Sequence, residues 1–333
     1  MIKVNTVKNI EVNVPESMDE DSSERFNITN IDDAIKYYIK NGYVVFSNYV
    51  SADKCDLIRD SWNNSIKKYN GKIYRQTTGK AEKNYLNDND WIMNPVLNIQ
   101  SLNSKNFGYF RDLIDKDIFN NEKICLFLKK LFNDKPKIIQ SMYFEGNSAT
   151  SEHQDTYYLD SEKIGTLTAG WVALEEIKAD AGRFFIFEGS HTVDITKLSN
   201  YEKILSNHDN YVDELISVCE KNNFKPKAPL LNKGDVLFWN SKTLHGSLNS
   251  QSKLYSRSSI TFHAIPNNHK FLHWHKHYIE TPTDNLGKSL IYRRKDQKLL
   301  KNRIIFNLES SFPNLFYFIK KNIVKYIFKQ KHY

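Results

Sequence analysis

Short runs of β-branched and aromatic residues dominate the chain from about residue 136 onward. Gly, Asn, Asp and Ser residues, which favour turns, separate each run from the next. The runs are KIIQSMYFE, GTLTAGWVALEEI, GRFFIFEGS, DVLFWNS and SRSSITFHAI. Short strands at this spacing predict a sandwich or a double-sheet jelly roll. We therefore expect a mainly β fold with flanking helices and a cupin-like jelly-roll core over about 136–265.

Two helices with a strand between them are predicted before this region. The apolar residues of IDDAIKYYIK (31–40) fall on one helical face, and Asn41-Gly42 marks the end of that helix. The run YVVFSNYV (43–50) has the composition of a strand. Ser51 is then expected to cap the second helix.

These patterns divide the chain into three parts. Residues 1–30 are polar with acidic patches, and we expect a flexible N-terminus. Residues 31–290 form a single predicted domain, in which 107–133 are mostly helical and 192–227 are a helical insertion between strands. Residues 291–333 form a basic, amphipathic C-terminal helical segment.

The net charge of +8 is concentrated in this C-terminal segment. It contains eleven Lys and Arg residues against Asp296 and Glu309, so the rest of the chain sums to about −1. Over 311–333, aromatic and apolar residues recur at helical spacing, and lysines recur four residues apart. Such a helix either lies at a membrane surface or packs its apolar side on the domain. Both interpretations stay open, and without a recognition motif no nucleic-acid partner is expected.

The composition indicates an intracellular protein. No run approaches 18 apolar residues, and the first residues lack the apolar stretch of a secretory signal. Cys55, Cys125 and Cys219 are widely spaced, which fits reduced thiols and gives no zinc signature. We expect a cytoplasmic protein, peripheral at the inner membrane surface if the C-terminal helix meets lipid.

The segment HQDTYYLD contains the first candidate chemistry. His153 and Asp155 are two residues apart, so on an extended strand both point to the same face. An imidazole and a carboxylate are suitable ligands for Fe, Mn or Zn. His245, directly after the strand-like run DVLFW, is the candidate third ligand. Taken alone, the His153 and Asp155 pair is equally well explained by a surface turn with an Asx-type hydrogen bond.

Arg257 strengthens the interpretation as a metal site. It follows His245 by 12 residues, and a guanidinium group there can bind a dicarboxylate in a bidentate pair. Ser247 can add a hydroxyl group to the same carboxylate. Two histidines and one carboxylate that share a face form the facial triad of non-haem Fe(II) oxygenases, which leaves three coordination positions open.

Together these motifs resemble the phytanoyl-CoA dioxygenase family. The resemblance rests on HQD (153–155), AGRFFIFEGSH (181–191), LHGS (244–247) and Arg257, and it covers roughly 30–265. NGYVVFSNYVSADKCDLI is similar to that family's opening strand and helix. The resemblance implies a double-stranded β-helix core and an Fe(II)- and 2-oxoglutarate-dependent dioxygenase.

The resemblance also implies roles for single residues. His153, Asp155 and His245 would bind iron, and Arg257 with Ser247 would hold the far carboxylate of 2-oxoglutarate. Three further residues would line the co-substrate and substrate cavity, unless they are ordinary core residues: Gln140, Tyr143 and Trp171.

The implied reaction uses O2 to hydroxylate an unactivated C–H bond of a small or medium metabolite, with release of succinate and CO2. A saccharide or a lipid-linked precursor is one hypothesis for the substrate. Asp155 argues for hydroxylation, because halogenating relatives lack this carboxylate. Two alternatives stay open: a non-catalytic jelly-roll module that binds a small ligand, and a cupin-type enzyme that uses Mn or Zn. The second would have no use for Arg257.

Several other residues are expected to have structural roles. Arg183 departs from the family pattern, and we expect it at the surface or in a salt bridge rather than against an anionic substrate. His191 is not expected to be a ligand, and His263 is expected to pack or to form a pocket wall. The run HKFLHWHKHY (269–278) is expected to be an exposed connection rather than a metal site.

Overall fold

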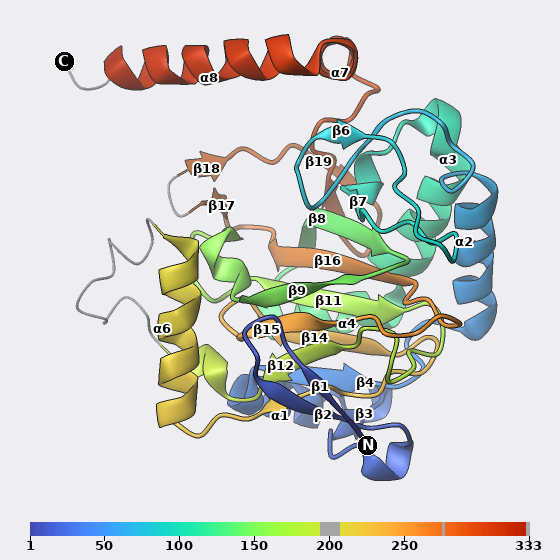
Figure 1. The fold of residues 1–333 in the computed structure, drawn as a ribbon, viewed down its shortest axis with the longest axis vertical. Helices are drawn as coiled ribbons and strands as arrows, with labels where there is room; N and C mark the ends of the chain where they lie inside the picture. Colours follow the sequence, from blue (N-terminus) through green and yellow to red (C-terminus); the bar gives the residue numbers. More distant parts are fainter. Residues whose placement is uncertain (194–206, 275–276, 331–333) are drawn as a thin grey trace.

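Two facing β-sheets form the centre of the computed structural model, which describes residues 1–193, 207–274 and 277–330, with the backbone alone for 323–330 (Figure 1). The strands of the large sheet are β3 (Arg25–Phe26), β4 (Tyr43–Phe46), β7 (Val96–Leu97), β8 (Pro136–Phe144), β11 (Thr168–Ala173), β14 (Val236–Asn240), β16 (Ser259–Pro266), β19 (Thr283–Asn285) and β20 (Leu290–Tyr292). Their order is β19-β20-β8-β16-β11-β14-β4-β3, and β7 also pairs with β8.

The smaller sheet has the order β13-β12-β15-β9. Its strands are β9 (Ser148–His153), β12 (Phe184–Phe187), β13 (Pro226–Lys227) and β15 (His245–Asn249). Side chains from β11 and β14 pack against those of β12 in one buried cluster. This pair of sheets is the jelly roll that the sequence predicts.

Strand β16 shows how the sequence produces this arrangement. Successive side chains of a strand point to opposite faces, and every residue of β16 is buried. Ile260, Phe262 and Ala264 face the helices and belong to the largest buried apolar cluster. Thr261 and His263 alternate with them and therefore face the smaller sheet. The interior between the sheets thus receives polar groups although both faces of β16 are buried.

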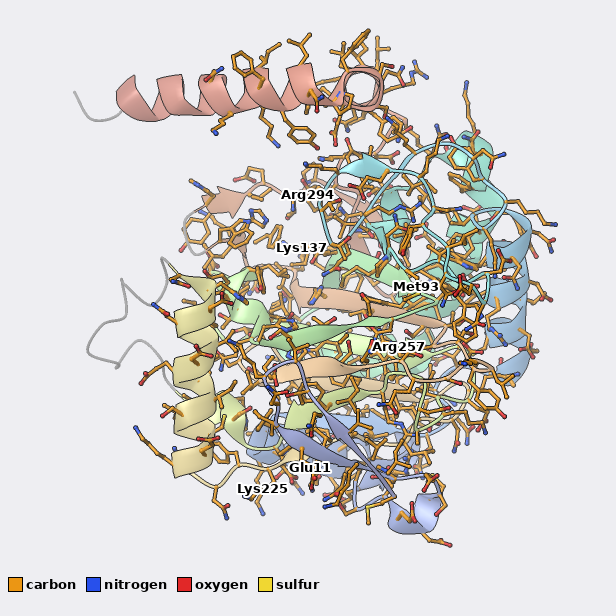
Figure 2. The ribbon with its side chains drawn as sticks, viewed as in Figure 1. Glu11, Met93, Lys137, Lys225, Arg257 and Arg294 are labelled. Carbon is orange, nitrogen blue, oxygen red and sulfur yellow. The ribbon has the colours of Figure 1, made fainter. Side chains whose placement is uncertain are left out.

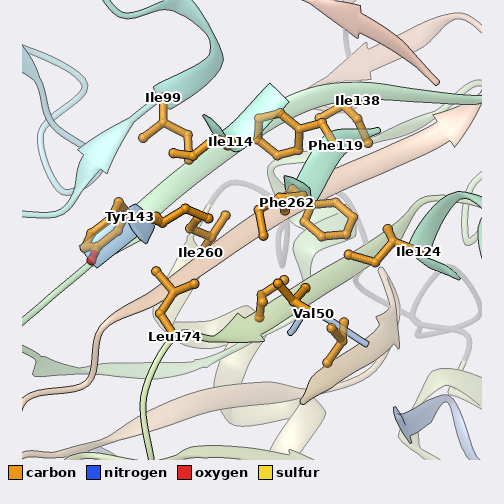
Figure 3. Packing of buried hydrophobic residues seen from close by; sticks show 14 of the residues in the cluster. Val50, Ile99, Ile114, Phe119, Ile124, Ile138, Tyr143, Leu174, Ile260 and Phe262 are labelled. Atoms are coloured by element: carbon orange, nitrogen blue, oxygen red, sulfur yellow. The ribbon is translucent and has the colours of Figure 1, made fainter. Parts of the chain in front are cut away.

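Four helices cover the outer face of the large sheet. They are α1 (Ile31–Asn41), α2 (Ala52–Asn64), α3 (Ser104–Ile114) and α4 (Glu122–Phe132). Gly42 ends α1 in the left-handed conformation, φ +79°, which favours glycine. Ile114, Phe119 and Ile124 from this helical layer pack against Ile260 and Phe262 of β16 (Figure 3).

The N-terminal segment is folded, which corrects the expectation of a flexible N-terminus. Strands β1 (Ile2–Asn5) and β2 (Glu11–Val14) form an antiparallel hairpin. Val4, Val12 and Val14 are buried on one face of this hairpin, because apolar residues alternate with polar ones in IKVN and EVNV. Strand β3 then pairs with β4 in parallel and joins this segment to the large sheet.

The predicted insertion at 192–227 contains helix α6 (His208–Lys221), and its residues 194–206 lie outside the described part of the chain. Tyr211, Val212 and Leu215 of α6 are buried against the smaller sheet. A third sheet consists of β10 (Leu159–Ser161), β17 (Phe271–His273) and β18 (His277–Ile279). A two-stranded sheet joins β5 (Ile73–Tyr74) and β6 (Ala81–Glu82).

The chain ends in helices α7 (Leu300–Ser311) and α8 (Pro313–Gln330). Helix α8 extends away from the two-sheet body (Figure 1). Over 313–322 none of its side chains is buried. Within the described residues, no helix is both long and apolar enough to cross a membrane.

Candidate metal centre

His153 and Asp155 lie where the strand-forming sequence of β9 ends. His153 is the last residue of β9, and Asp155 begins a short helical turn directly after it. Gln154 between them points the other way, into a buried contact with the hydroxyl of Tyr211, which donates to Oε1 at 2.7 Å. The alternation predicted for an extended strand therefore holds through Gln154, so His153 and Asp155 converge.

His245 joins this pair through strand pairing. It is the first residue of β15 and lies directly opposite His153 on the neighbouring strand β9. Its Nε2 lies 3.7 Å from Oδ1 of Asp155, and Nε2 of His153 lies 3.9 Å from the same oxygen. Two donors that are each about 2.1 Å from one cation are at most about 4.2 Å apart, so these separations fit a single bound metal ion.

The backbone fixes the orientation of both imidazole rings. Nδ1 of His153 lies 2.8 Å from the carbonyl oxygen of Ser151, and Nδ1 of His245 lies 2.8 Å from that of Thr243. A carbonyl oxygen only accepts, so each Nδ1 carries the proton and each Nε2 keeps its lone pair. A hydrogen bond of this kind from the second nitrogen is typical of metal-binding histidines.

Asp155 is oriented by Trp239, a residue that sequence reasoning missed. The indole Nε1–H of Trp239 donates to Oδ2 of Asp155 at 2.8 Å. Oδ1 is then the oxygen that faces the imidazoles. Burial opposes ionisation of Asp155, but the imidazoles of His245, His263 and His153 hold its pKa well below the ordinary value. Burial lowers the pKa of His245 to about 3. An ionised carboxylate beside a neutral imidazole is the protonation state that a metal ion requires.

Arg257 lies in the same interior and has no acidic partner among the described residues. It lies two residues before the start of β16, and Figure 2 shows it at the strand ends farthest from α6. Nη1 donates to the carbonyl oxygen of Gly182 at 3.0 Å, whereas Nε has no hydrogen-bond partner in the described structure. Burial lowers the pKa of Arg257 to about 9. A buried cation with free donors is suited to an anionic ligand.

Ser247 belongs to the same polar network, together with Asn147, which sequence reasoning did not find. The Ser247 hydroxyl donates to Oδ1 of Asn147 at 3.3 Å, and Nδ2 of Asn147 donates to the Gly182 carbonyl at 3.3 Å. Gly182 has φ +77°, and a Cβ atom there would lie 2.8 Å from Nδ2 of Asn147. Glycine at 182 therefore allows Asn147 and Arg257 to share one carbonyl group.

Aromatic rings connect this anchor with the metal ligands. The guanidinium carbon of Arg257 lies 5.1 Å from the ring centre of Phe144 and 5.6 Å from that of Trp171. Phe184 stacks on Trp171 at 5.9 Å and lies 5.4 Å from the ring of His245. Trp171 is thus buried between Arg257 and Phe184 in this interior.

The two other predicted wall residues lie on opposite faces of β8. Gln140 pairs across the strands with His263 and faces the same interior. Tyr143 is three residues further on, and an odd offset turns a strand side chain to the other face. It stacks on Trp62 of α2 at 3.8 Å, within the helix-side core (Figure 3). The prediction that Tyr143 lines the cavity is therefore wrong.

Arg183 is buried, which corrects its expected position at the surface or in a salt bridge. Its guanidinium donates to the backbone carbonyls of Pro15 at 2.6 Å and Ile177 at 2.8 Å. It therefore attaches the N-terminal segment to the smaller sheet. The side chain of the neighbouring Phe184 faces the interior instead.

The remaining histidines do not form a second metal cluster in the part of the chain that is described. The only group of three or more ligand atoms that converge there is that of His153, Asp155 and His245, all within 4.8 Å of one another. Nε2 of His191 contacts the carbonyl of Ile39 instead. In the histidine-rich run HKFLHWHKHY, which includes β17 of the third sheet, His275 lies outside the described residues.

Comparisons with known proteins agree with this geometry. The family model described as phytanoyl-CoA dioxygenase (PhyH) matches residues 38–259. The phytanoyl-CoA dioxygenase domain-containing protein 1 homolog of Caenorhabditis elegans is 25% identical over 177 residues, which cover 50% of this chain and 59% of that protein. The chain thus matches less than two thirds of the length of this relative.

Solved structures share the fold. The non-heme alpha ketoglutarate dependent carbocyclase SnoK from nogalamycin biosynthesis matches with a TM-score of 0.53 at 16% identity, over 75% of this chain and 89% of that one. The epimerase SnoN, in complex with Fe3+, alpha ketoglutarate and nogalamycin RO, matches with a TM-score of 0.51 at 12% identity, over 73% and 86%. The predicted fold class is confirmed. The chain belongs to the phytanoyl-CoA dioxygenase family.

Proposed function

We propose that this protein is an Fe(II)- and 2-oxoglutarate-dependent dioxygenase that hydroxylates a small or medium metabolite. The observation that carries this proposal is the buried guanidinium of Arg257, which has no acidic partner among the described residues and lies in the same interior as the three metal ligands. A buried charge without a partner is costly, so a ligand that neutralises it explains why it is there. 2-Oxoglutarate has both the carboxylate for Arg257 and a chelating end for a metal ion.

One set of residues would bind the metal ion, and another would bind the co-substrate. His153, His245 and Oδ1 of Asp155 would hold Fe(II), with Trp239 and two backbone carbonyls fixing their orientation. Arg257, with Ser247 and Asn147 beside it, would hold the far carboxylate. Bound iron with 2-oxoglutarate supplies the oxidation of a C–H bond by O2, with succinate and CO2 as co-products. The buried walls at Trp171 and Phe184 would exclude water from this space.

The competing functions use only part of this site. A Mn or Zn cupin would need the three ligands but not Arg257. A non-catalytic module would need neither the free Nε2 atoms nor an ionised Asp155. The bound 2-oxoglutarate and iron of the structural neighbour SnoN also support the proposal.

We also propose that the C-terminal helix of the segment 311–333 contacts an anionic membrane surface, whereas the oxygenase domain spans 31–290. Three apolar side chains of α8 are largely exposed: Leu315 at 57%, Phe318 at 67% and Ile319 at 45%. No acidic residue occurs after Glu309, and five lysines follow it. This supports membrane contact over the alternative of packing on the jelly roll. Membrane contact through α8 would be consistent with a lipid-linked substrate. It would also be consistent with a cytoplasmic protein at the inner membrane surface.

The direct test of the oxygenase proposal is turnover of the co-substrate. Fe(II)-loaded protein incubated with 2-oxoglutarate and O2 is expected to form succinate slowly even without a substrate. The variant His153→Ala should form none, because it removes a ligand. Lack of 2-oxoglutarate-dependent succinate formation in the iron-loaded native protein would refute the proposal.

A further inference from the structure

A small cavity lies between the two-sheet body and the C-terminal segment. Its walls come from residues 69–74 and 97–107 on one side and from residues 294–306 on the other. The described lining residues include none of those proposed to bind iron or 2-oxoglutarate. The volume of about 30 Å³ corresponds to roughly two or three water molecules, so the cavity can hold one small group but no complete metabolite.

Three cationic side chains line this cavity in the described part of the chain: Lys72, Arg294 and Lys295. Each is partly buried, and none forms an ion pair with a described acidic residue. Nζ of Lys72 donates to the carbonyl oxygen of Ser310, which is a neutral partner. Figure 2 shows Arg294 on the side of the body that faces α8. Cations that gather in a partly buried space without acids favour an anionic ligand.

The residue before this pair shows how the same segment uses a cation for folding. Arg293 donates to Oδ2 of Asp115 at 2.6 Å and to Oδ2 of Asp284 at 2.7 Å. Arg294 and Lys295 follow it directly but line the cavity instead. Burial lowers the pKa of Arg294, and it lowers the pKa of Lys295 to about 8. Two of three consecutive cations therefore lose hydration without gaining an acidic partner among the described residues.

A buried hydroxyl group faces the same problem. Ser101 lines the cavity and is 7% exposed, and its Oγ has no hydrogen-bond partner in the described structure. Buried polar groups are almost always hydrogen-bonded, so an unpaired hydroxyl group beside unpaired cations requires an explanation. A ligand that carries negative charge and accepts hydrogen bonds would satisfy both.

Glu309 does not neutralise these cations. Its charge acts on Lys295, but the two side chains form no ion pair. Its carboxylate oxygens accept from the hydroxyl of Tyr74 at 3.0 Å, the hydroxyl of Tyr317 at 2.5 Å and the amide of Ala81 at 3.2 Å. Nζ of Lys295 lies 3.8 Å from the ring centre of Tyr74 instead. Neutral donors thus hold the carboxylate, and the cations stay available for a ligand.

We propose that this cavity binds a phosphate group, held by Lys72, Arg294 and Lys295 with the hydroxyl of Ser101. A phosphate monoester carries a charge of about −1.5 to −2 at neutral pH and has three strong acceptor oxygens. Several cations and a hydroxyl group match this ligand better than a carboxylate with its single charge. The guanidinium of Arg294 can bind two of the oxygens at once. This site goes beyond the proposed oxygenase function and does not depend on it.

Two sources of such a phosphate fit the position of the cavity. One is a soluble phosphorylated metabolite, whose remainder would stay outside because the cavity is small. The other is a phospholipid headgroup, because the wall at residues 294–306 includes part of α7, which leads into the exposed helix α8. Both present the same group to the same side chains.

Calorimetric titration of the full-length protein with inorganic phosphate tests the site. The variant Arg294→Gln/Lys295→Gln removes two charges from the cavity. Lys298→Gln/Lys301→Gln removes two exposed charges from the same segment and is the matched control. Arg257→Met shows whether phosphate binds the buried guanidinium of the metal centre instead. Thermal unfolding is measured for every variant.

The native protein is expected to bind one equivalent of phosphate. Arg294→Gln/Lys295→Gln should raise the dissociation constant about a hundred-fold, because two hydrogen bonds between charged groups are lost. Ser101→Ala keeps all charges and the fold, and it should raise the constant about five-fold through the loss of one hydrogen bond. Lys298→Gln/Lys301→Gln and Arg257→Met should bind phosphate like the native protein.

Sedimentation with vesicles distinguishes the two sources. Phosphatidic acid in phosphatidylcholine vesicles presents a phosphate monoester, whereas phosphatidylglycerol presents a diester. A headgroup ligand predicts a preference for phosphatidic acid that Ser101→Ala reduces. If Ser101→Ala weakens the binding of inorganic phosphate but leaves vesicle binding unchanged, the ligand is a soluble phosphate.

Three results would overturn the inference. In the first, the native protein does not bind phosphate. In the second, Ser101→Ala and Arg294→Gln/Lys295→Gln both bind it like the native protein. In the third, Lys298→Gln/Lys301→Gln or Arg257→Met weakens binding as much as the cavity variant, so that phosphate binds through general surface charge or at the metal centre.

Discussion

The indole nitrogen of Trp239 donates a hydrogen bond to Oδ2 of Asp155 at 2.8 Å, and this leaves Oδ1 as the oxygen that faces the three imidazoles. Trp239 lies on β14 of the large sheet, whereas Asp155 follows β9 of the smaller sheet. The contact therefore joins the two sheets at the metal centre and fixes the carboxylate before a metal ion binds.

Replacement of Trp239 should weaken metal binding. Trp239→Phe keeps an aromatic ring but removes the N–H group, so Asp155 can rotate. We expect the dissociation constant for Mn(II) to rise about ten-fold or more, as for other groups that orient metal ligands. Calorimetric titration with Mn(II) measures it. Trp62→Phe, on the helix side of the sheet, is the control, and equal metal affinity in both variants would contradict this role of Trp239.

In the ligand-free protein, the buried charge of Arg257 should lower the free energy of unfolding. Its guanidinium is buried beside the carbonyl of Gly182 and has no ionic partner in the described structure. We expect Arg257→Met to raise the free energy of unfolding by about 1–2 kcal/mol, since an apolar side chain replaces a buried charge. Urea unfolding of the metal-free protein measures this change.

The control for that experiment is Arg183→Met. Arg183 is also buried, but it donates to two backbone carbonyls. Its replacement leaves these carbonyls unpaired, so it should lower the free energy of unfolding by about 2 kcal/mol. Destabilisation of similar size in both variants would show that Arg257 is a structural residue.

Acid should destabilise the metal-free protein through His245. Burial lowers the pKa of its imidazole to about 3, against about 6.5 in an unfolded chain. The unfolded state therefore binds the additional proton between these values, and the stability contributed by neutral His245 is complete above pH 6.5 and decreases as the pH falls toward 3. At pH 5 the loss should be about 2 kcal/mol.

Urea unfolding of the metal-free protein at pH 7.5 and pH 5.0 checks this expectation. The variant His245→Leu has no imidazole at this position, so its stability should fall less between the two pH values. Identical pH dependence in the native protein and the variant would refute the assignment to His245.

The C-terminal helix should bind anionic membranes through its lysines. The double variant Lys320→Glu/Lys321→Glu reverses two charges on α8, and attraction to an anionic surface is about 1 kcal/mol per lysine. We expect binding to phosphatidylglycerol vesicles in a sedimentation assay to fall about ten-fold or more. Lys40→Glu/Lys129→Glu, which makes the same charge change at exposed positions on α1 and α4, is the control. Equal binding of both variants and the native protein would argue against a membrane role for α8.

Parts of the site could be predicted because sequence spacing determines them. Residues two apart on an extended segment share a face, so HQD alone brings His153 and Asp155 together. The same rule separates Gln140 from Tyr143, whose odd offset turns them to opposite faces of β8. The N-terminal hairpin also has a two-residue period, at Val12 and Val14, although polar neighbours lower its overall hydrophobicity.

Other parts depend on strand pairing that spacing does not determine. Trp239 reaches Asp155 and Asn147 reaches Ser247 only because strands distant in the sequence face each other. That Arg257 has no acidic partner among the described residues is likewise a property of the folded interior. No local pattern around these residues indicates it.

The most direct test of the central claim is anaerobic addition of 2-oxoglutarate to the Fe(II)-loaded protein, followed by visible absorption. If the metal centre and Arg257 bind the co-substrate together, a weak charge-transfer band of the chelate should appear. It should weaken in Arg257→Ala and be absent in His153→Ala. A native protein that contains Fe(II) at one equivalent and gives no such band at saturating 2-oxoglutarate would contradict the account.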